Sequence, residues 1–369
     1  MMPTVIVLGA SVRAACASAR RAGVRTYAAD LFADCDTRRL AVRTIRVRPW
    51  PAGCIEAMTQ FPHVPWMYTG ALENHPQLLR QLAELRPLLG NPHDVVRQVR
   101  DPLQVAAALR AAGLPSADAR RTPVQKHHDR WLRKPLQGAG GLGIDRADEV
   151  GCEIDGRHYW QRHVFGRAAS AVFVAADGRA DLLGTTYQIV GDAAFGASGF
   201  RYAGNLAPGP SEPAILEQIR AIGETLAAAF QLRGLFGVDG VVTERDFVPV
   251  EVNPRFTASV DVLEMLRPES LVARHLAACQ PELPPPKVGP KAEHPVPAAG
   301  KAILFAPHRF VVDDALARQL ARQSNGSRYA DLPRLGERIK QGHPIATALA
   351  VDESTTLVEQ RLKQMACAV

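Results

Sequence analysis

Val250-Glu251-Val252-Asn253-Pro254-Arg255 is a short apolar strand that ends in a carboxylate, an amide and a guanidinium. Because side chains alternate along a strand, Glu251, Asn253 and Arg255 are predicted to share one face. Burying three such groups is costly unless they have a partner. Two hard oxygen ligands beside a cation suit a magnesium-bound polyphosphate far better than they suit a protein core.

A second apolar strand is expected over residues 235–242, and it contains Asp239. The polar residues Thr243 to Asp246 form a predicted hairpin turn between the two strands. This order sets Asp239 beside Glu251 on paired strands. A surface hairpin with a solvated edge is the alternative, but the flanking residues are too apolar for an exposed ribbon.

A glycine-rich segment follows Lys134, with four glycines in six residues at Gly138, Gly140, Gly141 and Gly143. Backbone amides without side chains can approach phosphate oxygens closely, and Lys134 supplies a positive charge beside them. The order differs from a P-loop, in which the lysine follows the glycines. Such a segment alone is more often a flexible hairpin, but together with the two strands it indicates a nucleotide site.

Bulk composition describes a globular chain. The 369 residues are 47% hydrophobic and 22% charged, which allows two or three domains. The net charge is +7, but no basic run is interleaved with aromatic residues, so we expect an anionic substrate and no nucleic acid. Six scattered cysteines indicate reduced thiols and a cytoplasmic location. No membrane span or signal peptide is expected.

The N-terminus is typical of a βαβ unit, with a strand at Thr4–Leu8, a helix at Val12–Ala22 and a strand at Val24–Ala28. Asp30 lies about 20 positions after the glycine turn, as in dinucleotide-binding folds. The turn keeps one glycine where that fingerprint needs three. An NAD-dependent oxidoreductase is therefore an alternative that this segment disfavours.

The motifs together resemble the ATP-grasp superfamily, in the branch of biotin carboxylase and carbamoyl-phosphate synthetase large subunits. The order is strand–Lys134–glycine loop, then Gln161-Arg162-His163-Val164, then Asp239, then Glu251-x-Asn253-Pro254-Arg255. The chain is also similar to carboxylate–amine ligases of the methanofuran and tetrahydromethanopterin cofactor pathways. The resemblance covers roughly residues 1–280 and, more weakly, the remainder.

This resemblance implies an ATP-grasp fold of mixed α/β and α+β class. The expected parts are a Rossmann-like pre-grasp domain at 1–95, an ATP-grasp domain at 96–280 and a small β-rich domain at 281–369. The two lobes of the ATP-grasp domain are expected around a linker at 159–166. Residues 332–345 resemble half of a biotinyl-type hammerhead that lacks the carrier lysine, which indicates a structural role.

The resemblance also implies residue roles. Lys134 contacts the α- and β-phosphates, the four glycines close over the triphosphate, and residues 161–164 contact adenine and ribose. Asp239, Glu251 and Asn253 hold Mg²⁺, with Mn²⁺ as an alternative. Arg255 stabilises the acyl-phosphate or the transferred phosphoryl group, so Arg255 and Lys134 are the catalytic candidates.

The activity implied is an ATP-dependent ligase that activates a carboxylate as an acyl-phosphate and couples it to an amine, releasing ADP and phosphate. The expected partners are a small-molecule acid and amine, and a homodimer is an expected assembly because related ligases are often dimers. A carboxylate is a poor acyl donor until it is phosphorylated, so positioning and electrostatics would do most of the catalysis.

Some positions depart from the pattern or leave alternatives open. Pro102 stands where family members often have a second phosphate lysine, and Arg100 is a candidate replacement. The missing lysine makes a non-catalytic ATP-binding module a further alternative. Ser11, Arg13 and Arg201 are candidates for contact with the substrate. Helix capping is the alternative role for Ser11, and an ordinary surface position is the alternative for Arg201.

Overall fold

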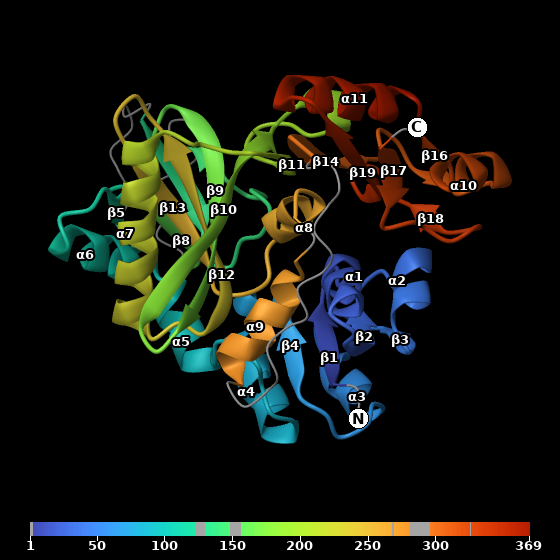
Figure 1. Ribbon diagram of the computed structural model, residues 1–369, viewed down its shortest axis with the longest axis horizontal. Helices are drawn as coiled ribbons and strands as arrows, with labels where there is room; N and C mark the ends of the chain where they lie inside the picture. The colour runs from blue at the N-terminus through green and yellow to red at the C-terminus, as the bar shows by residue number, and fades with distance from the viewer. Residues whose placement is uncertain (1–2, 123–129, 148–155, 268, 281–295, 325) are drawn as a thin grey trace.

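The computed structural model describes residues 3–122, 130–147, 156–267, 269–280, 296–324 and 326–369. The class is mixed α/β and α+β, as predicted (Figure 1). No helix in these ranges is both long enough and apolar enough to cross a membrane.

The N-terminal region is a parallel four-stranded sheet in the order β3-β2-β1-β4. The predicted βαβ unit is confirmed, because β1 pairs with β2 in parallel along its whole length. Every residue of β1 after Thr4 is buried, which explains its continuous apolar run. The elements are β1 Thr4–Gly9, α1 Arg13–Arg21, β2 Arg25–Asp30, α2 Cys35–Leu40, β3 Arg43–Arg46, α3 Cys54–Thr59 and β4 Trp66–Tyr68.

Three helices lead from this sheet to a small antiparallel sheet in the order β5-β8-β6-β7. The helices are α4 Pro76–Leu85, α5 His93–Val99 and α6 Pro102–Ala111. Pro102 opens α6 at its first turn, where the missing N–H has no helical partner in any case. The strands are β5 Ala119–Arg120, β6 Trp131–Pro135, β7 Asp145–Arg146 and β8 His158–Arg162.

A nine-stranded sheet runs through the rest of the molecule in the order β13-β12-β9-β10-β11-β14-β19-β17-β16. Helix α7, Pro213–Phe230, has buried isoleucines at Ile215, Ile219 and Ile222, close to helical spacing. The strands, in chain order, are β9 Arg167–Ala176, β10 Arg179–Val190, β11 Tyr202–Ala207, β12 Gly234–Val242, β13 Phe247–Asn253, β14 Ala298–Phe305, β16 Gln323–Ser324, β17 Ser327–Ala330 and β19 Pro344–Asp352.

The main strands of the C-terminal region, β14, β19, β17 and β16, belong to the nine-stranded sheet. Strand β14 pairs with β11, so the nine-stranded sheet continues from the expected 96–280 domain into the expected 281–369 domain. The region nevertheless has its own apolar core, to which β14, β19 and α11, Thr355–Cys367, contribute. The boundary predicted at 280/281 adjoins residues 281–295, which lie outside the described part of the chain. Only β18, Arg338–Ile339, is strand within the predicted 332–345 β segment before β19 begins, and β18 pairs with β15, Phe310–Val311.

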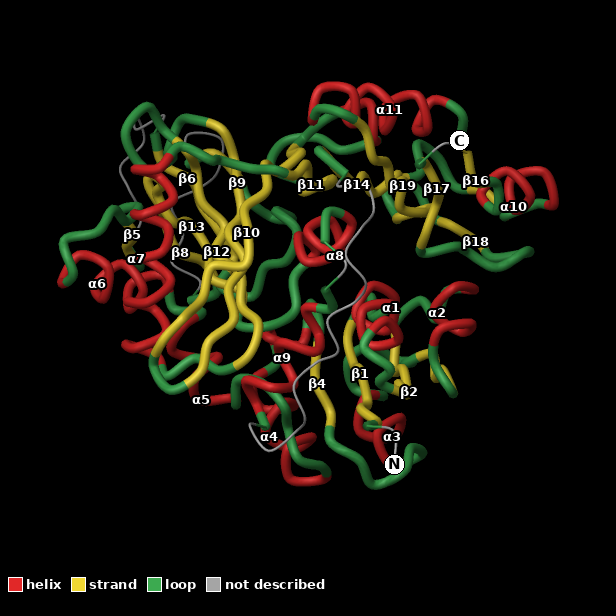
Figure 2. The backbone as a smooth tube through the Cα atoms, in the orientation of Figure 1, coloured by secondary structure: helices red, strands yellow, loops and turns green. Residues whose placement is uncertain are grey.

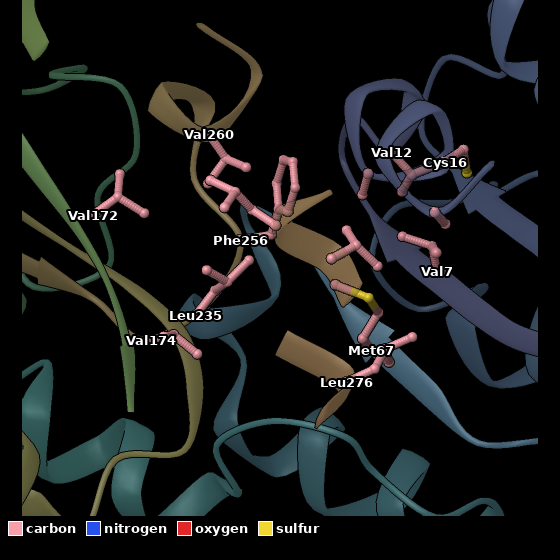
Figure 3. Close-up of a cluster of buried hydrophobic side chains, with 14 of the residues drawn as sticks. Val7, Val12, Cys16, Met67, Val172, Val174, Leu235, Phe256, Val260 and Leu276 are labelled. Carbon is pink, nitrogen blue, oxygen red and sulfur yellow. The ribbon is translucent and has the colours of Figure 1, made fainter. Parts of the chain in front are cut away.

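One apolar cluster joins the N-terminal sheet to the large sheet (Figure 3). Val7 and Met67 belong to strands of the N-terminal sheet, and Val12 directly precedes α1. Val172 and Leu235 belong to strands of the large sheet, and all five side chains are buried. Helices α8, Ala258–Met265, and α9, Leu271–Cys279, lie between the two parts (Figure 2). This continuous packing fixes the N-terminal sheet against the strands that carry the predicted site.

Candidate active site

The predicted carboxylate pair is brought together by the β12–β13 hairpin. The two strands are antiparallel, and Asp239 stands opposite Glu251. Asn253 donates from Nδ2 to Asp239 Oδ2 at 2.9 Å. The other oxygen, Asp239 Oδ1, accepts from Ser170 Oγ at 2.5 Å and from Gln188 Nε2 at 2.9 Å. Ser170 and Gln188 were not predicted, although a lone glutamine in the apolar run of β10 was a signal for a functional position.

The two carboxylates differ in their charge environment. Burial and the neighbouring charge of Glu251 raise the pKa of Asp239 to about 6. Burial would also raise the pKa of Glu251, but Arg100 and Lys134 hold that pKa below its usual value. A divalent cation between the two would favour both ionised forms. Two carboxylates and an amide oxygen are a donor set that suits Mg²⁺, so the residues present fit the ion.

Lys134 lies across the cleft on β6 and is only 8% exposed. Its Nζ donates to Gln161 Oε1 at 3.0 Å and to the Val250 carbonyl at 3.4 Å. Lys134 is therefore tied to Gln161 in the predicted linker and to the strand that carries Glu251.

The rest of the linker is more open. The His163 ring packs 4.4 Å from the Phe165 ring, and burial lowers the pKa of His163, which favours the neutral imidazole. Val164 lines the cleft, and the exposed Arg162 lies 3.8 Å from Asp118. The arrangement leaves an apolar and aromatic surface beside Lys134.

The glycine loop bends over the cleft. Gly140, Gly141 and Gly143 have φ of +61°, +74° and +73°, which L side chains rarely adopt. A Cβ on Gly141 would lie 1.9 Å from the Phe200 carbonyl oxygen. Tyr202 donates its backbone N–H to Gly140 O at 3.0 Å. Glycine is therefore required at 141 for the loop to approach residues 200–202.

Arg255 is held by a residue that sequence reasoning missed. Its Nη2 donates to Glu73 Oε1 at 2.6 Å and to Asn253 Oδ1 at 3.0 Å. Glu73 is 3% exposed and comes from the N-terminal region, just past the carboxyl end of β4. Polar residues at the carboxyl ends of parallel strands are typical of ligand sites, which was the available signal.

Arg100 occupies the position between the glycine loop and the carboxylates. It is ion-paired with Glu251, and its Nη2 donates to the Gly138 carbonyl at 3.1 Å and to Asn74 Oδ1 at 3.3 Å. Glu251 holds the pKa of Arg100 above its usual value, against the effect of burial. The Arg100 guanidinium is therefore a fixed positive charge near Pro102, the position at which the second phosphate lysine is missing.

Although Arg100 lines a smaller adjoining cavity, most of these residues line one cavity of about 560 Å³, a size common for ligand sites. Three buried polar atoms at its wall, His163 Nδ1, Arg255 Nε and Thr257 Oγ1, have no hydrogen-bond partner within the described ranges. Unpaired buried polar atoms in a cleft are expected where a polar ligand binds. The predicted residues that line this cavity are Lys134, Gly140, Gly141, Gln161, Arg162, His163, Val164, Asp239, Glu251, Asn253 and Arg255; Gly138 lines a smaller cavity that shares Lys134, Gly141 and Glu251.

The three substrate candidates lie elsewhere. Arg13 is 5% exposed and is ion-paired with Asp261 at 2.7 Å and Asp331 at 3.0 Å, so its guanidinium is engaged within the protein. Arg201 stacks 3.6 Å from the centre of the Phe305 ring and donates to the Gly342 carbonyl. Ser11 is exposed at a second cavity, next to the C-terminal strands.

Comparison with known proteins agrees with this geometry. Residues 99–259 match the family model of an ATP-grasp domain. The chain is 27% identical over 246 residues to an uncharacterized protein of Methanocaldococcus jannaschii, which covers 64% of this chain and 54% of that protein. The chain thus spans about half the length of this curated relative.

Two solved structures show a similar fold. The first is the biotin carboxylase domain of 2-oxoglutarate carboxylase from Hydrogenobacter thermophilus, with MgADP, ADP and bicarbonate, at a TM-score of 0.69 and 14% identity over 98% of this chain and 89% of that one. The second is an L-amino acid ligase from Bacillus licheniformis, at a TM-score of 0.71 and 14% identity over 98% of this chain and 96% of that one. Residues 99–259 thus match an ATP-grasp domain, and the chain has the fold of these two solved structures.

Proposed function

We propose that this protein is an ATP- and Mg²⁺-dependent ligase that activates a carboxylate as an acyl-phosphate and joins it to an amine. The observation that carries the proposal is the pairing of Asp239 with Glu251, across the cleft from Lys134 and below the glycine loop. Two observations on similar structures support it: the biotin carboxylase domain contains MgADP, and the second structure is an L-amino acid ligase.

Each group of residues has a role in this reaction. Lys134 and the glycine loop bind the phosphates, while Asp239, Glu251 and Asn253 would hold Mg²⁺. When bound, Mg²⁺ neutralises charge on the phosphate oxygens during phosphoryl transfer. Arg255 supplies a further positive charge that Glu73 and Asn253 keep in place.

Two bond exchanges complete the reaction. A carboxylate oxygen of the acid bonds to the γ-phosphorus of ATP as the bond to the bridging oxygen breaks, and ADP leaves. The amine nitrogen then bonds to the carbonyl carbon, phosphate leaves with the bond electrons, and the nitrogen loses a proton. A closed glycine loop keeps water from the acyl-phosphate.

The structure disfavours the oxidoreductase alternative. Asp30, the acid expected to bind a ribose, already accepts backbone N–H groups from Val12 at 2.8 Å and from Phe32 and Ala33 at 2.7 Å. A Cβ on Gly9 would lie 2.0 Å from Thr69 Oγ1, so that glycine serves packing against the neighbouring strand. Neither residue is left for a dinucleotide.

Trapping of the acyl-phosphate tests the proposal without knowledge of the amine. Hydroxylamine converts an acyl-phosphate to a hydroxamate, so protein, Mg-ATP, hydroxylamine and a panel of carboxylic acids are expected to yield a hydroxamate and ADP for the correct acid. Glu251→Gln should abolish both products. Asp177→Asn, which removes one exposed carboxylate from the β9–β10 turn at a φ that asparagine tolerates, is the matched control. Mg-ATP binding without ADP or hydroxamate from any acid would favour the non-catalytic module instead.

A further inference from the structure

A second cavity of about 200 Å³ lies where the N-terminal sheet meets the C-terminal region. Helix α2 is hydrogen-bonded to residues 331–333 at this place. In Figure 1, α2 lies below β18. Cys35 donates its N–H to the Leu332 carbonyl at 2.9 Å, and Asp331 donates its N–H to Asp36 Oδ2 at 2.8 Å. Two segments that are about 300 positions apart in the sequence and hydrogen-bonded to each other therefore border the cavity.

Asp34 is an unpaired carboxylate in the wall of this cavity. It is 7% exposed, and its side chain has neither a hydrogen bond nor an ion pair with any residue of the described ranges. Asp34 precedes α2 at the N-cap position, where aspartate ordinarily accepts a backbone N–H from the first turn. Here it makes no such bond. A carboxylate that forgoes its local partner and remains buried indicates a ligand.

The neighbouring acidic groups are all satisfied, which singles out Asp34. Asp30 accepts three backbone N–H groups, as described above, and Asp36 accepts those of Asp331 and Leu332. Asp331 is paired with Arg13 at 3.0 Å, and Glu337 is paired with Arg46 at 2.8 Å.

The cations near the cavity leave this carboxylate uncompensated. Arg13 and Arg46 are engaged with Asp331 and Glu337, while Arg338 and His343 line the cavity without an ion pair to Asp34. Burial, and then the charges of Asp331, Asp30, Asp36 and Glu337, raise the pKa of Asp34 to about 9. At neutral pH Asp34 therefore holds a proton that a cationic ligand would displace.

Part of the cavity lining is apolar and comprises Phe32, Ile303, Ile339 and Ile345. An acidic group and apolar side chains in one cavity match a ligand with a charged end and a hydrocarbon body. Within the described ranges, no group of three or more His, Cys, Asp or Glu side chains is arranged to hold a metal ion.

We propose that this cavity binds an aliphatic compound bearing a cationic amino group, with the ammonium donating to Asp34 and the carbon chain lying on the isoleucines. The site is separate from the cleft between Lys134 and Glu251, and binding requires neither ATP nor turnover. A short stretch of chain nevertheless connects the two sites. At the cavity, the Ser11 carbonyl accepts a hydrogen bond from Thr69 Oγ1 at 2.9 Å. The residue after Thr69 is Gly70, and a Cβ added there would lie 3.5 Å from Arg255 Cζ in the cleft.

Isothermal titration calorimetry with pentylamine tests this proposal, with 1-pentanol and ammonium chloride as probes that lack the charge or the chain. We expect pentylamine to bind the full-length protein at least tenfold more tightly than either probe. Asp34→Asn should lose at least tenfold of that affinity, whereas the exposed Asp177→Asn should keep it. Titration at pH 7 in buffers of different ionisation enthalpy should show about one proton released per pentylamine bound, and none for Asp34→Asn.

Other results would overturn the proposal. They are equal binding of pentylamine to wild type and Asp34→Asn, equal binding of 1-pentanol and pentylamine, no binding of pentylamine, or displacement of pentylamine by millimolar MgCl₂. Ile303→Ala provides a second test that does not depend on the folding of Asp34→Asn. This variant removes part of the apolar lining and leaves Asp34 in place. It should weaken pentylamine binding while the proton release persists. All these measurements omit ATP, so a negative result here leaves the ligase proposal standing, and the reverse also holds.

Discussion

Arg13→Met should destabilise the protein strongly, because Arg13 joins three parts of the chain. From α1 its Nη2 contacts Asp261 Oδ2 on α8 at 2.7 Å, and its Nε contacts Asp331 Oδ1 beside β17 at 3.0 Å. With Arg13 5% exposed and Asp261 7% exposed, the variant leaves carboxylates without their main counter-charge. Breaking a buried pair by removal of one partner costs about 3–5 kcal/mol. For a chain of this length, that loss lowers Tm by about 4–6 °C.

Urea unfolding followed by circular dichroism measures this loss. Lys363→Met is the matched control, because it removes a half-exposed lysine paired with Glu359 and Asp192, whose ion pairs should contribute less than about 1 kcal/mol each. A double-mutant cycle of Arg13→Met with Asp261→Asn should give a coupling energy of about 1–3 kcal/mol. A loss for Arg13→Met no larger than that of the control, or additive effects in the cycle, would refute this reasoning.

The loss should also depend on pH. Arg13 holds the pKa of Asp261 and of Asp331 below the usual range, despite burial that would raise both. A depressed carboxylate pKa stabilises the folded state above the unfolded pKa of about 4, and the stabilisation disappears as pH falls through the folded value. The difference between wild type and Arg13→Met should therefore be full at pH 6–7 and shrink below about pH 4.

Three further predictions concern the cleft and the second cavity. Gly141→Ala should raise the KM for ATP about tenfold or more in the ADP assay, since its Cβ would meet Phe200 O at 1.9 Å, whereas Gly140→Ala, with similar φ and nothing within 4 Å, should raise it less. Glu73→Gln should lower kcat about tenfold with little change in ATP affinity by calorimetry, because Arg255 loses its charged partner; unchanged kcat would count against a positioning role. Asp34→Asn should flatten the pH dependence of stability, because a folded pKa of about 9 makes the wild type lose stability as pH rises from about 4 to 9. Urea midpoints at pH 5 and pH 8 that fall equally in both proteins would contradict this.

Local patterns in the sequence were enough to predict much of the fold. The apolar runs of β1 and β12 are signals carried by a few neighbouring residues, so these strands were predicted with nearly the observed bounds, whereas β13 begins at Phe247 and ends at Asn253, before Arg255. The Asp239–Glu251 pairing was predictable for the same reason, because a short turn joins the two strands.

Contacts between distant segments could not be predicted in this way. Glu73 meets Arg255 across 182 positions, and β11 pairs with β14 to carry the sheet past the expected domain boundary. Arg13 looked free for substrate because its aspartate partners lie 248 and 318 positions away. Asp34 had no motif around it, and its unpaired state is visible only once α2 is seen against the C-terminal segment.

The most direct test of the central claim is the Mg²⁺ dependence of ATP binding, measured by calorimetry for wild type, Asp239→Asn and Glu251→Gln. If the β12–β13 hairpin holds the metal of a bound polyphosphate, Mg²⁺ should tighten ATP binding to wild type at least tenfold, or about 1.4 kcal/mol. Each variant should lose most of that gain, and Asp177→Asn should keep it. An undiminished effect of Mg²⁺ in both variants would contradict the account.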